Sequence, residues 1–504
     1  MAYKPLPVII KNFFGGISDD PRKVSANEFQ ITKHFDIFSQ PNRLTPYRSL
    51  EADTETSVSA TDLKQYLVRD FLYASTSAKL YGLGQTGAGL TKIVQKADAT
   101  SGLWTLPASS EGNGAVWNGC FVEYKDYLWG FQGTNQIWKW GLLSGTPSIT
   151  NTASGGTVGA TITSVANGVI TPGTGDLYLA YNNVIVRILP DLTITDEAIT
   201  VASNLKITSL TNYGNYLAVG CSPVSSFNGT SKVFIWNLSS ELFQETIEWG
   251  EGDLRILETI EGMLVGVSDL YLNNATGAGR GSMVVRTYAG GAAQVQKEIF
   301  TQALTGKTIP TSKAVKNNRL FWAAKIMTNS AGTTYHEGLW SYGRKNVNYP
   351  YSLTLDVIDE NIDTDGIQGF GAAANYFFIG HSLDGSVDKT NDAATYAFTS
   401  IYESQIYDLG DPTMTKQLLQ FSVYTAPLPA SSTVTVKYKN DSDTSFTTIG
   451  TLSTTGAESR DFYNIESTGA DFATNKEVTF RLESTGGAEI TGYKIIQLPL
   501  TGSN

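Results

Sequence analysis

The sequence predicts an all-β protein: a β-propeller of about seven blades, with an extended N-terminal arm before it and a C-terminal β-sandwich of jelly-roll type after it. Three observations lead to this prediction. A strand-and-turn unit recurs seven times, the composition suits short strands joined by tight turns, and beyond about residue 400 apolar and polar residues alternate strictly. We place the arm at residues 1–55, the propeller at 56–402 and the sandwich at 403–504.

The arm differs in charge and composition from the rest of the chain. Residues 1–50 hold seven Lys and Arg against four Asp and Glu, which gives +3 and leaves −14 for the remainder of a chain whose net charge is −11. Prolines at 5, 7, 21, 41 and 46 keep the segment extended. Its apolar residues are too scattered for a core of their own, so we expect an ordered strap that docks on its own propeller or on a neighbouring subunit.

The side chains expected to make these contacts are the aromatic residues of the arm and two of its arginines. Burial of such apolar side chains is worth about 1.5–3 kcal/mol each, more than a surface ion pair at about 0–1 kcal/mol. The aromatic residues are therefore expected to anchor the arm, and the arginines to orient it. An equally weighted alternative is that the arm completes the first or last blade of the propeller. The candidate interface residues are Phe13, Phe14, Phe35, Phe38, Arg43, Tyr47 and Arg48.

The repeated unit consists of a short aromatic-aliphatic run, a Gly/Asn/Ser turn and a second apolar run. A single four-stranded blade cannot bury both of its faces, so strands repeated at intervals of 39 to 57 residues predict blades packed side by side in a ring. Six blades would result if two units shared one sheet. The seven runs begin at Leu72, Tyr127, Leu177, Tyr216, Met263, Leu320 and Tyr376.

The composition agrees with many short strands. The chain has 49 Gly, which supply positive φ in turns, and 11% aromatic residues, which fill pleated faces. No window carries a long apolar stripe of period 3.6, and no run approaches 18 apolar residues. We therefore expect few helices and no membrane insertion. Cys120 and Cys221 are expected to be buried, reduced thiols rather than a disulfide.

Strict alternation predicts the strands of the sandwich. It is clearest over 433–438 and 478–482, where apolar side chains would line one face of a sheet and polar ones the other. Turn clusters such as Asn440-Asp441-Ser442-Asp443 separate these runs. About 100 residues of this pattern predict a separate sandwich.

No catalytic, cofactor-binding or metal-binding constellation accompanies the strands, so we expect a protein that is not an enzyme. A glycine motif at 82–87 lacks the helix that a dinucleotide site requires. Ser382, within a motif similar to a nucleophile elbow, lacks the second glycine. An acidic run from Asp356 to Asp365 lacks the spacing of a calcium loop, and we interpret it as a solvated loop between blades.

The acidic net charge argues against a nucleic-acid-binding surface, because phosphate contacts require clustered Lys and Arg. The same charge would suit a wall that DNA passes without binding, although ordinary solubility is the favoured explanation of the charge.

Three groups of segments together resemble a family. In the arm they are 11–19, 33–37 and 43–50; in the propeller 207–220 and 234–236; and at the start of the sandwich 404–410. They resemble the propeller-bearing structural proteins of tailed bacteriophage virions, among them the nozzle and hub proteins of short-tailed phages. The resemblance implies a virion protein assembled in the host cytoplasm, without catalytic residues or cofactors, that forms homomeric rings and contacts other tail proteins.

Two alternatives belong to other classes. One is a carbohydrate-binding adhesin that recognises the host surface through propeller loops or the sandwich. The other, a glycan-active propeller enzyme, is disfavoured because the sequence has no sialidase-type Asp boxes and only three histidines.

Overall fold

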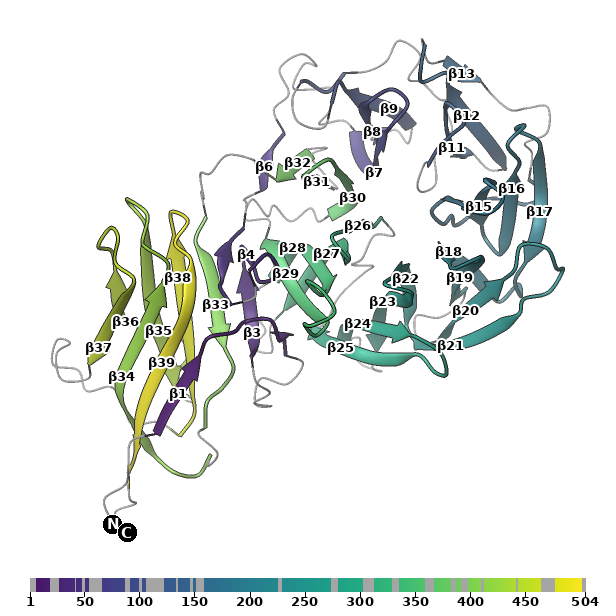
Figure 1. The fold of residues 1–504 in the computed structure, drawn as a ribbon. Helices are drawn as coiled ribbons and strands as arrows, with labels where there is room; N and C mark the ends of the chain where they lie inside the picture. Colours follow the sequence, from purple (N-terminus) through teal and green to yellow (C-terminus); the bar gives the residue numbers. More distant parts are fainter. Residues whose placement is uncertain are drawn as a thin grey trace.

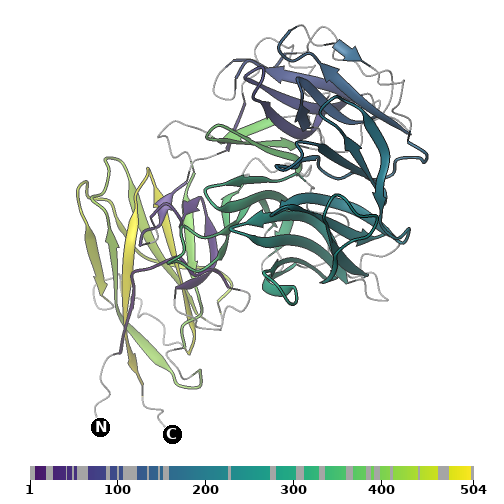
Figure 2. The same cartoon turned by 45° about the vertical axis from the view of Figure 1, so that its right-hand side comes forward.

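The computed structural model shows a ring of β-sheets beside a second, two-sheet body (Figures 1 and 2). The structure describes residues 6–18, 27–40, 42–47, 50–53, 66–86, 91–98, 102–105, 122–132, 135–145, 148–150, 158–224, 229–272, 280–301, 312–328, 335–358, 367–381, 387–390, 398–408, 412–440, 443–463 and 476–500. Within these ranges every regular element is a β-strand and none is a helix, which confirms the predicted all-β class. Nowhere in the described part of the chain is there a helix long and apolar enough to cross a membrane.

The described strands of the ring form seven sheets, numbered here as blades 1–7. Neighbouring strands pair antiparallel, and in blades 1–6 they follow each other in chain order. Blade 1 contains β7 (Tyr66–Ala74), β8 (Lys79–Thr86) and β9 (Thr91–Lys96). Blade 2 contains β10 (Val122–Tyr124), β11 (Tyr127–Gln132), β12 (Gln136–Gly141) and β13 (Ser148–Thr150). Blade 3 contains β14 (Val169–Ile170), β15 (Leu177–Tyr181), β16 (Val184–Ile188) and β17 (Ile194–Thr200). Blade 4 contains β18 (Leu205–Tyr213), β19 (Tyr216–Pro223), β20 (Thr230–Trp236) and β21 (Glu245–Glu251).

The remaining blades continue in the same direction around the ring (Figure 1). Blade 5 contains β22 (Asp253–Ile260), β23 (Met263–Leu272), β24 (Arg280–Tyr288) and β25 (Gln294–Thr301). Blade 6 contains β26 (Ala314–Lys316), β27 (Arg319–Thr328), β28 (Tyr335–Gly343) and β29 (Ser352–Ile358). Blade 7 contains β30 (Ile367–Ala373), β31 (Tyr376–His381), β32 (Val387–Thr390) and β6 (Leu50–Ala52). The number of sheets is compatible with the predicted count of about seven.

The repeated sequence runs occupy the same structural position in six blades. The runs that begin at Tyr127, Leu177, Tyr216, Met263, Leu320 and Tyr376 lie on β11, β15, β19, β23, β27 and β31, the second strand of each blade. The run that begins at Leu72 differs in position, because it lies near the end of β7, the first strand of blade 1, and β8 is the second. The glycine motif at 82–87 begins on β8, in a strand rather than before a helix.

Apolar contacts between neighbouring blades hold the ring together. The described residues form seven hydrophobic clusters, and each one spans a different junction between two blades. At the junction of blades 7 and 1, for example, the rings of Phe71 and Phe378 lie 5.9 Å apart. Each blade buries its faces against the blades on either side, which is the reason a propeller must close.

The N-terminal segment supplies the strand that closes the ring. Residues 50–52 of β6 pair with residues 388–390 of β32, so blade 7 combines an early and a late part of the chain. Immediately after β6, the carboxylate of Asp53 accepts hydrogen bonds from the Lys96 ammonium at 2.6 and 2.7 Å and from the Trp104 indole at 2.8 Å. Lys96 and Trp104 belong to the blade 1 side, so this buried carboxylate connects the two sides of the closure.

The second body consists of two β-sheets packed face to face. One contains β1 (Leu6–Ile10), β39 (Ile490–Pro499), β34 (Lys416–Thr425) and β37 (Ser459–Tyr463). The other contains β2 (Gly16–Ile17), β3 (Glu28–Lys33), β33 (Ser400–Ser404), β38 (Val478–Thr485), β35 (Thr433–Asn440) and β36 (Thr447–Leu452). Phe421 of the first sheet and Phe480 of the second meet at 5.0 Å between ring centroids. The predicted alternation is present in β35, where Val434 and Val436 are fully buried.

The arm is part of both bodies rather than a separate unit. Strand β1 pairs with β39, and β3 pairs with β33, so the arm contributes strands to both sheets of the sandwich. A short hairpin of β4 (Phe35–Asp36) and β5 (Thr45–Pro46) follows, before β6 enters blade 7. The predicted boundary of the sandwich at residue 403 therefore leaves out three strands from the arm and the start of β33. The alternation pattern could not reveal that these strands belong to the sandwich, because the partners of β1 and β3 in β39 and β33 are about 370 or more residues away in sequence.

Candidate functional site: the domain junction and the central cavity

Three of the predicted interface residues are buried within the chain itself. Phe13 and Phe35 are fully buried and Phe38 is nearly so. The Phe13 ring packs edge-on against Tyr402 at 5.3 Å, inside the sandwich. The structure thus places these aromatic anchors in the chain's own core, where they join the sandwich to blades 5 and 6, and a surface for a neighbouring subunit must be sought elsewhere.

Phe14, Arg43 and Tyr47 also contact other parts of the chain. The half-buried Phe14 meets Tyr349 at 5.4 Å between ring centroids. Arg43 pairs with Glu489 of the sandwich at 2.8 Å, and Tyr47 packs against the apolar cluster of blades 6 and 7. Arg48 lies outside the described residues.

The ion pairs that fix the arm on the propeller come from the blades, and the sequence analysis did not single them out. The Lys297 ammonium of β25 lies 2.7 Å from the Glu28 carboxylate of β3. The Arg319 guanidinium of β27 lies 3.5 Å from the carboxylate of Asp36, and its carbon lies 3.9 Å from the centre of the Phe38 ring. The arm is thus held at two places, by an ion pair at Glu28 and by an ion pair together with a cation–π contact at residues 36–38.

Asp356 is the buried partner that holds Arg319 in place. Its Oδ1 lies 2.6 Å from Nη2 of Arg319, and both side chains are almost inaccessible to solvent. Burial raises the pKa of Asp356. Burial acts to lower the pKa of Arg319, but the charges of Asp356 and Asp36 outweigh it and raise that pKa. The interpretation of the acidic run as a solvated loop was therefore wrong for Asp356; its members from Asp359 to Asp365 lie outside the described residues.

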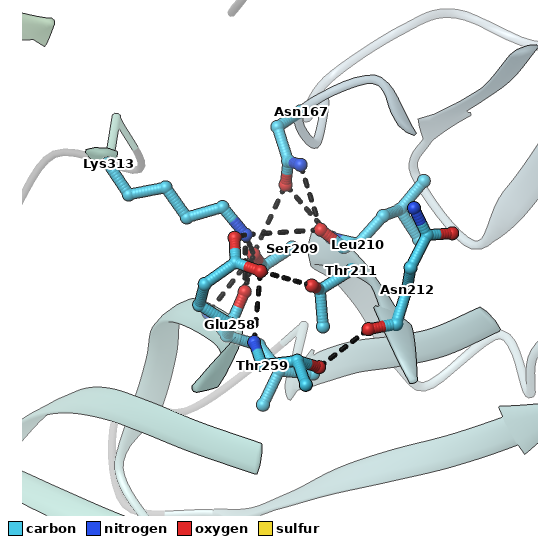
Figure 3. Close-up of polar contacts among 9 residues, drawn as sticks. Asn167, Ser209, Leu210, Thr211, Asn212, Glu258, Thr259 and Lys313 are labelled. Atoms are coloured by element: carbon cyan, nitrogen blue, oxygen red, sulfur yellow. Dashed lines mark hydrogen bonds and ion pairs between the residues drawn. The ribbon is translucent and has the colours of Figure 1, made fainter. Parts of the chain in front are cut away.

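A central cavity of about 660 Å³ lies where the inner segments of blades 1 to 6 converge. Its polar wall is a hydrogen-bonded cluster from blades 3 to 6 (Figure 3). The Lys313 ammonium, just before β26, lies 3.0 Å from the Glu258 carboxylate of β22 and donates to the backbone oxygens of Leu210 and Leu257. With Ser209 these contacts give four acceptors for the three N–H groups of the ammonium. Lys313 therefore connects blades 4, 5 and 6 and has no donor left for a ligand.

Asparagine and threonine side chains extend the cluster to blade 3. The Asn167 amide pairs with the backbone of Leu210 through both its oxygen and its nitrogen (Figure 3). The amide nitrogen of Asn212 donates to the carbonyl of Ile170, and Thr259 donates to the carbonyl of Asn212. Each of these bonds crosses between two blades, so the cluster sets the spacing of the blades at the cavity wall.

The charge of Glu258 is stabilised by this cluster. Burial acts to raise its pKa, but Lys313 and the hydrogen bonds from Thr211 and the backbone of Thr259 outweigh burial and lower the pKa below the ordinary value of 4.5. A carboxyl group whose pKa is lower in the folded state stabilises the protein above the unfolded-state pKa. That contribution is lost as the pH falls below 4.5 through the folded-state pKa.

We therefore expect acid to weaken the cavity wall through Glu258. Glu258→Gln removes the titrating group, so the difference in melting temperature between wild type and variant is expected to be largest near pH 7 and to shrink below pH 4.5. Thermal unfolding between pH 7 and pH 3 measures this, with the exposed Glu248→Gln as the matched control. A difference that does not change with pH would contradict the assignment.

The described residues contain no group of three or more His, Cys, Asp and Glu side chains placed to bind a metal ion. Cys221 is a buried free thiol, and burial raises its pKa, while Cys120 lies outside the described residues. The described lining of the central cavity thus offers neutral hydrogen-bonding side chains, the Lys313–Glu258 ion pair and the carboxylate of Asp70.

No protein-family model and no curated protein matches the sequence. Solved structures that are similar include the WD40 domain of Pan2 from Neurospora crassa, with a TM-score of 0.40 and 9% identity over 68% of this chain and 95% of that one. A virginiamycin B lyase from Staphylococcus aureus has a TM-score of 0.43 and 12% identity over 68% and 98% of the two chains. The Dos1 propeller has a TM-score of 0.40 and 13% identity over 68% and 94%.

Proposed function

We propose that this protein is a structural component of a tailed-phage virion, an adaptor, nozzle or hub of the tail. In this role it assembles with copies of itself into a ring and contacts other tail proteins. The resemblance of the arm, blade and sandwich segments to such proteins supports the proposal. The acidic net charge of −11 supports passage of DNA through the assembly without specific binding, since acidic walls repel phosphate.

The observation that carries the proposal is the way the arm joins the propeller to the sandwich. One continuous apolar cluster contains Trp322 of blade 6, Phe13 of the arm and Phe421 of the sandwich. Two ion pairs, Lys297–Glu28 and Arg319–Asp36, flank it. Large apolar interfaces prevent relative domain motion, so the chain is a stiff two-body subunit. A component that keeps its neighbours in register within a tail requires this property.

Assembly of the purified chain tests the proposal. We expect homomeric rings in negative-stain electron microscopy and a matching molar mass in size-exclusion chromatography with light scattering. A chain that stays monomeric at every concentration, and that does not bind portal or tail proteins produced with it, would overturn the proposal.

Loosening the junction tests the contribution of stiffness to assembly. In the double variant Glu28→Gln/Asp36→Asn the arm loses its two charges toward the propeller, whereas the Asn oxygen can still accept from the backbone N–H groups of residues 38 and 39 that Asp36 now binds. We expect a protein that forms at most about half as many rings but stays folded, because the substituted amides still offer an oxygen to Lys297 and Arg319, and Arg319 keeps its ion pair with Asp356. The exposed pair Lys232–Glu248, neutralised in the same way, is the matched control. Unchanged ring formation in the double variant would show that assembly does not depend on the stiffness of this junction.

A further inference from the structure

A second hollow lies beside the central cavity, between blades 3 and 4. It has a volume of about 430 Å³ and is lined by the loop 171–174, the turn 214–216 and residues 237–239, together with Arg187. Asn212 borders both this groove and the central cavity. The groove is therefore an open surface site that continues toward the centre of the ring.

An exposed aromatic side chain borders the groove. Tyr216 is 43% exposed, although it begins the second strand of its blade, where Leu177 of blade 3 is fully buried and Tyr376 of blade 7 is 4% exposed. The turn before it contains Gly214 at φ 60°, and Leu217 after it is fully buried, so the ring stands on a well-anchored hairpin. A rigid tyrosine at the surface offers an apolar face and a hydroxyl at low entropic cost.

Neutral hydrogen-bonding groups surround this ring. Arg187 uses Nε and Nη2 to bind the buried carboxylate of Asp176, at 2.7 and 2.6 Å, which fixes the guanidinium and cancels its charge. Within the described residues the side chain of Asn215 makes no hydrogen bond. The oxygen of Asn237 accepts from two backbone N–H groups of its own turn, which leaves its NH₂ group as a donor.

We propose that this groove binds a neutral oligosaccharide. The apolar C–H face of a pyranose ring stacks on an aromatic side chain such as Tyr216, and amide and guanidinium donors satisfy sugar hydroxyls. A phosphorylated or carboxylated ligand finds no unpaired positive charge among the described lining residues, because Asp176 neutralises Arg187. The inference does not depend on ring assembly: a single subunit that never assembles would bind the same sugar.

A glycan microarray tests the proposal. It carries neutral gluco-, galacto- and manno-oligosaccharides beside sialylated and phosphorylated ones. Calorimetry with the best neutral ligand follows. We expect the array to retain neutral glycans. Tyr216→Ala is expected to lose about tenfold or more in affinity, which corresponds to about 1.4 kcal/mol. Tyr216→Phe keeps the aromatic ring, so its affinity is expected to change by less than about threefold. Tyr463→Ala is the matched control, because Tyr463 is 44% exposed and lies on β37 of the sandwich.

Three results would overturn the proposal: no neutral glycan retained, a preference for acidic glycans, or binding that survives Tyr216→Ala. Circular dichroism of each variant shows that it is folded, as expected for a substitution at an exposed turn. Failure of this experiment leaves ring assembly untouched, and failure of ring assembly leaves this experiment untouched, so the two proposals are distinguishable.

Discussion

Deletion of residues 1–53 is expected to abolish folding of the propeller, whereas deletion of residues 1–47 spares it. The longer deletion removes β6 and Asp53, so the edge of β32 loses its partner and Lys96 and Trp104 lose the carboxylate that they share. The shorter deletion keeps both and removes the arm strands of the sandwich together with the β4–β5 hairpin. A blade without its closing strand leaves an open edge and an open apolar junction.

The two deletions serve as controls for each other. Hydrogen exchange of peptides that cover β31 and β32 is the measurement, with circular dichroism for total β-structure. We expect protection of these peptides after the shorter deletion and none after the longer one. Equal protection in both would mean that β6 is dispensable for closure.

Asp53→Ala is expected to be among the most destabilising single substitutions in the chain. The variant leaves the buried Lys96 ammonium and the Trp104 indole without their acceptor, and Lys389, 3.5 Å away, loses a counter-charge. Breaking a buried pair by removing one partner costs about 3–5 kcal/mol. Burial already lowers the pKa of Lys96, against the bonds to Asp53, so removal of the carboxylate leaves a poorly solvated charge.

Urea unfolding followed by tryptophan fluorescence measures this loss. Glu248→Ala breaks an exposed pair of the same 2.6 Å length and is expected to cost about 0–1 kcal/mol. Adding Lys96→Met to Asp53→Ala is expected to recover part of the loss, because it removes the unpaired charge. A cost for Asp53→Ala no larger than that of the control would show that the closure does not depend on this pair.

Local patterns predicted the local structure well. The second strands of six blades start at the repeated runs because a strand covered on both faces must be apolar, and this is visible in sequence at residues such as Leu177 and Tyr376. In blade 1 the aromatic-aliphatic run at Leu72 lies on the first strand, so composition alone does not distinguish the first strand of a blade from the second. The alternation in β35 is equally local, since each second side chain faces the core.

Long-range pairing could not be predicted in the same way. Nothing near Glu28 indicates that its partner is Lys297, and nothing near Asp356 indicates that Arg319 makes it a buried ion pair. Phe13 and Phe35 of the arm are buried, and where they pack depends on strand pairing across the whole chain. Tyr216 was assigned to a strand, and its exposure at the groove depends on the neighbouring blade.

The pairing of β1 with β39 has a consequence for how the chain acquires its structure during synthesis. Leu6 and Ile490, the first residues of these strands, are 484 positions apart. At about 5–20 residues per second of translation, the first strand waits roughly 25–100 s for its partner to be made. During that time the propeller blades can form in order, while the apolar edge of the arm stays unpaired. The sandwich is thus the last part to be completed, and only after translation of β39 can the chain become a finished subunit.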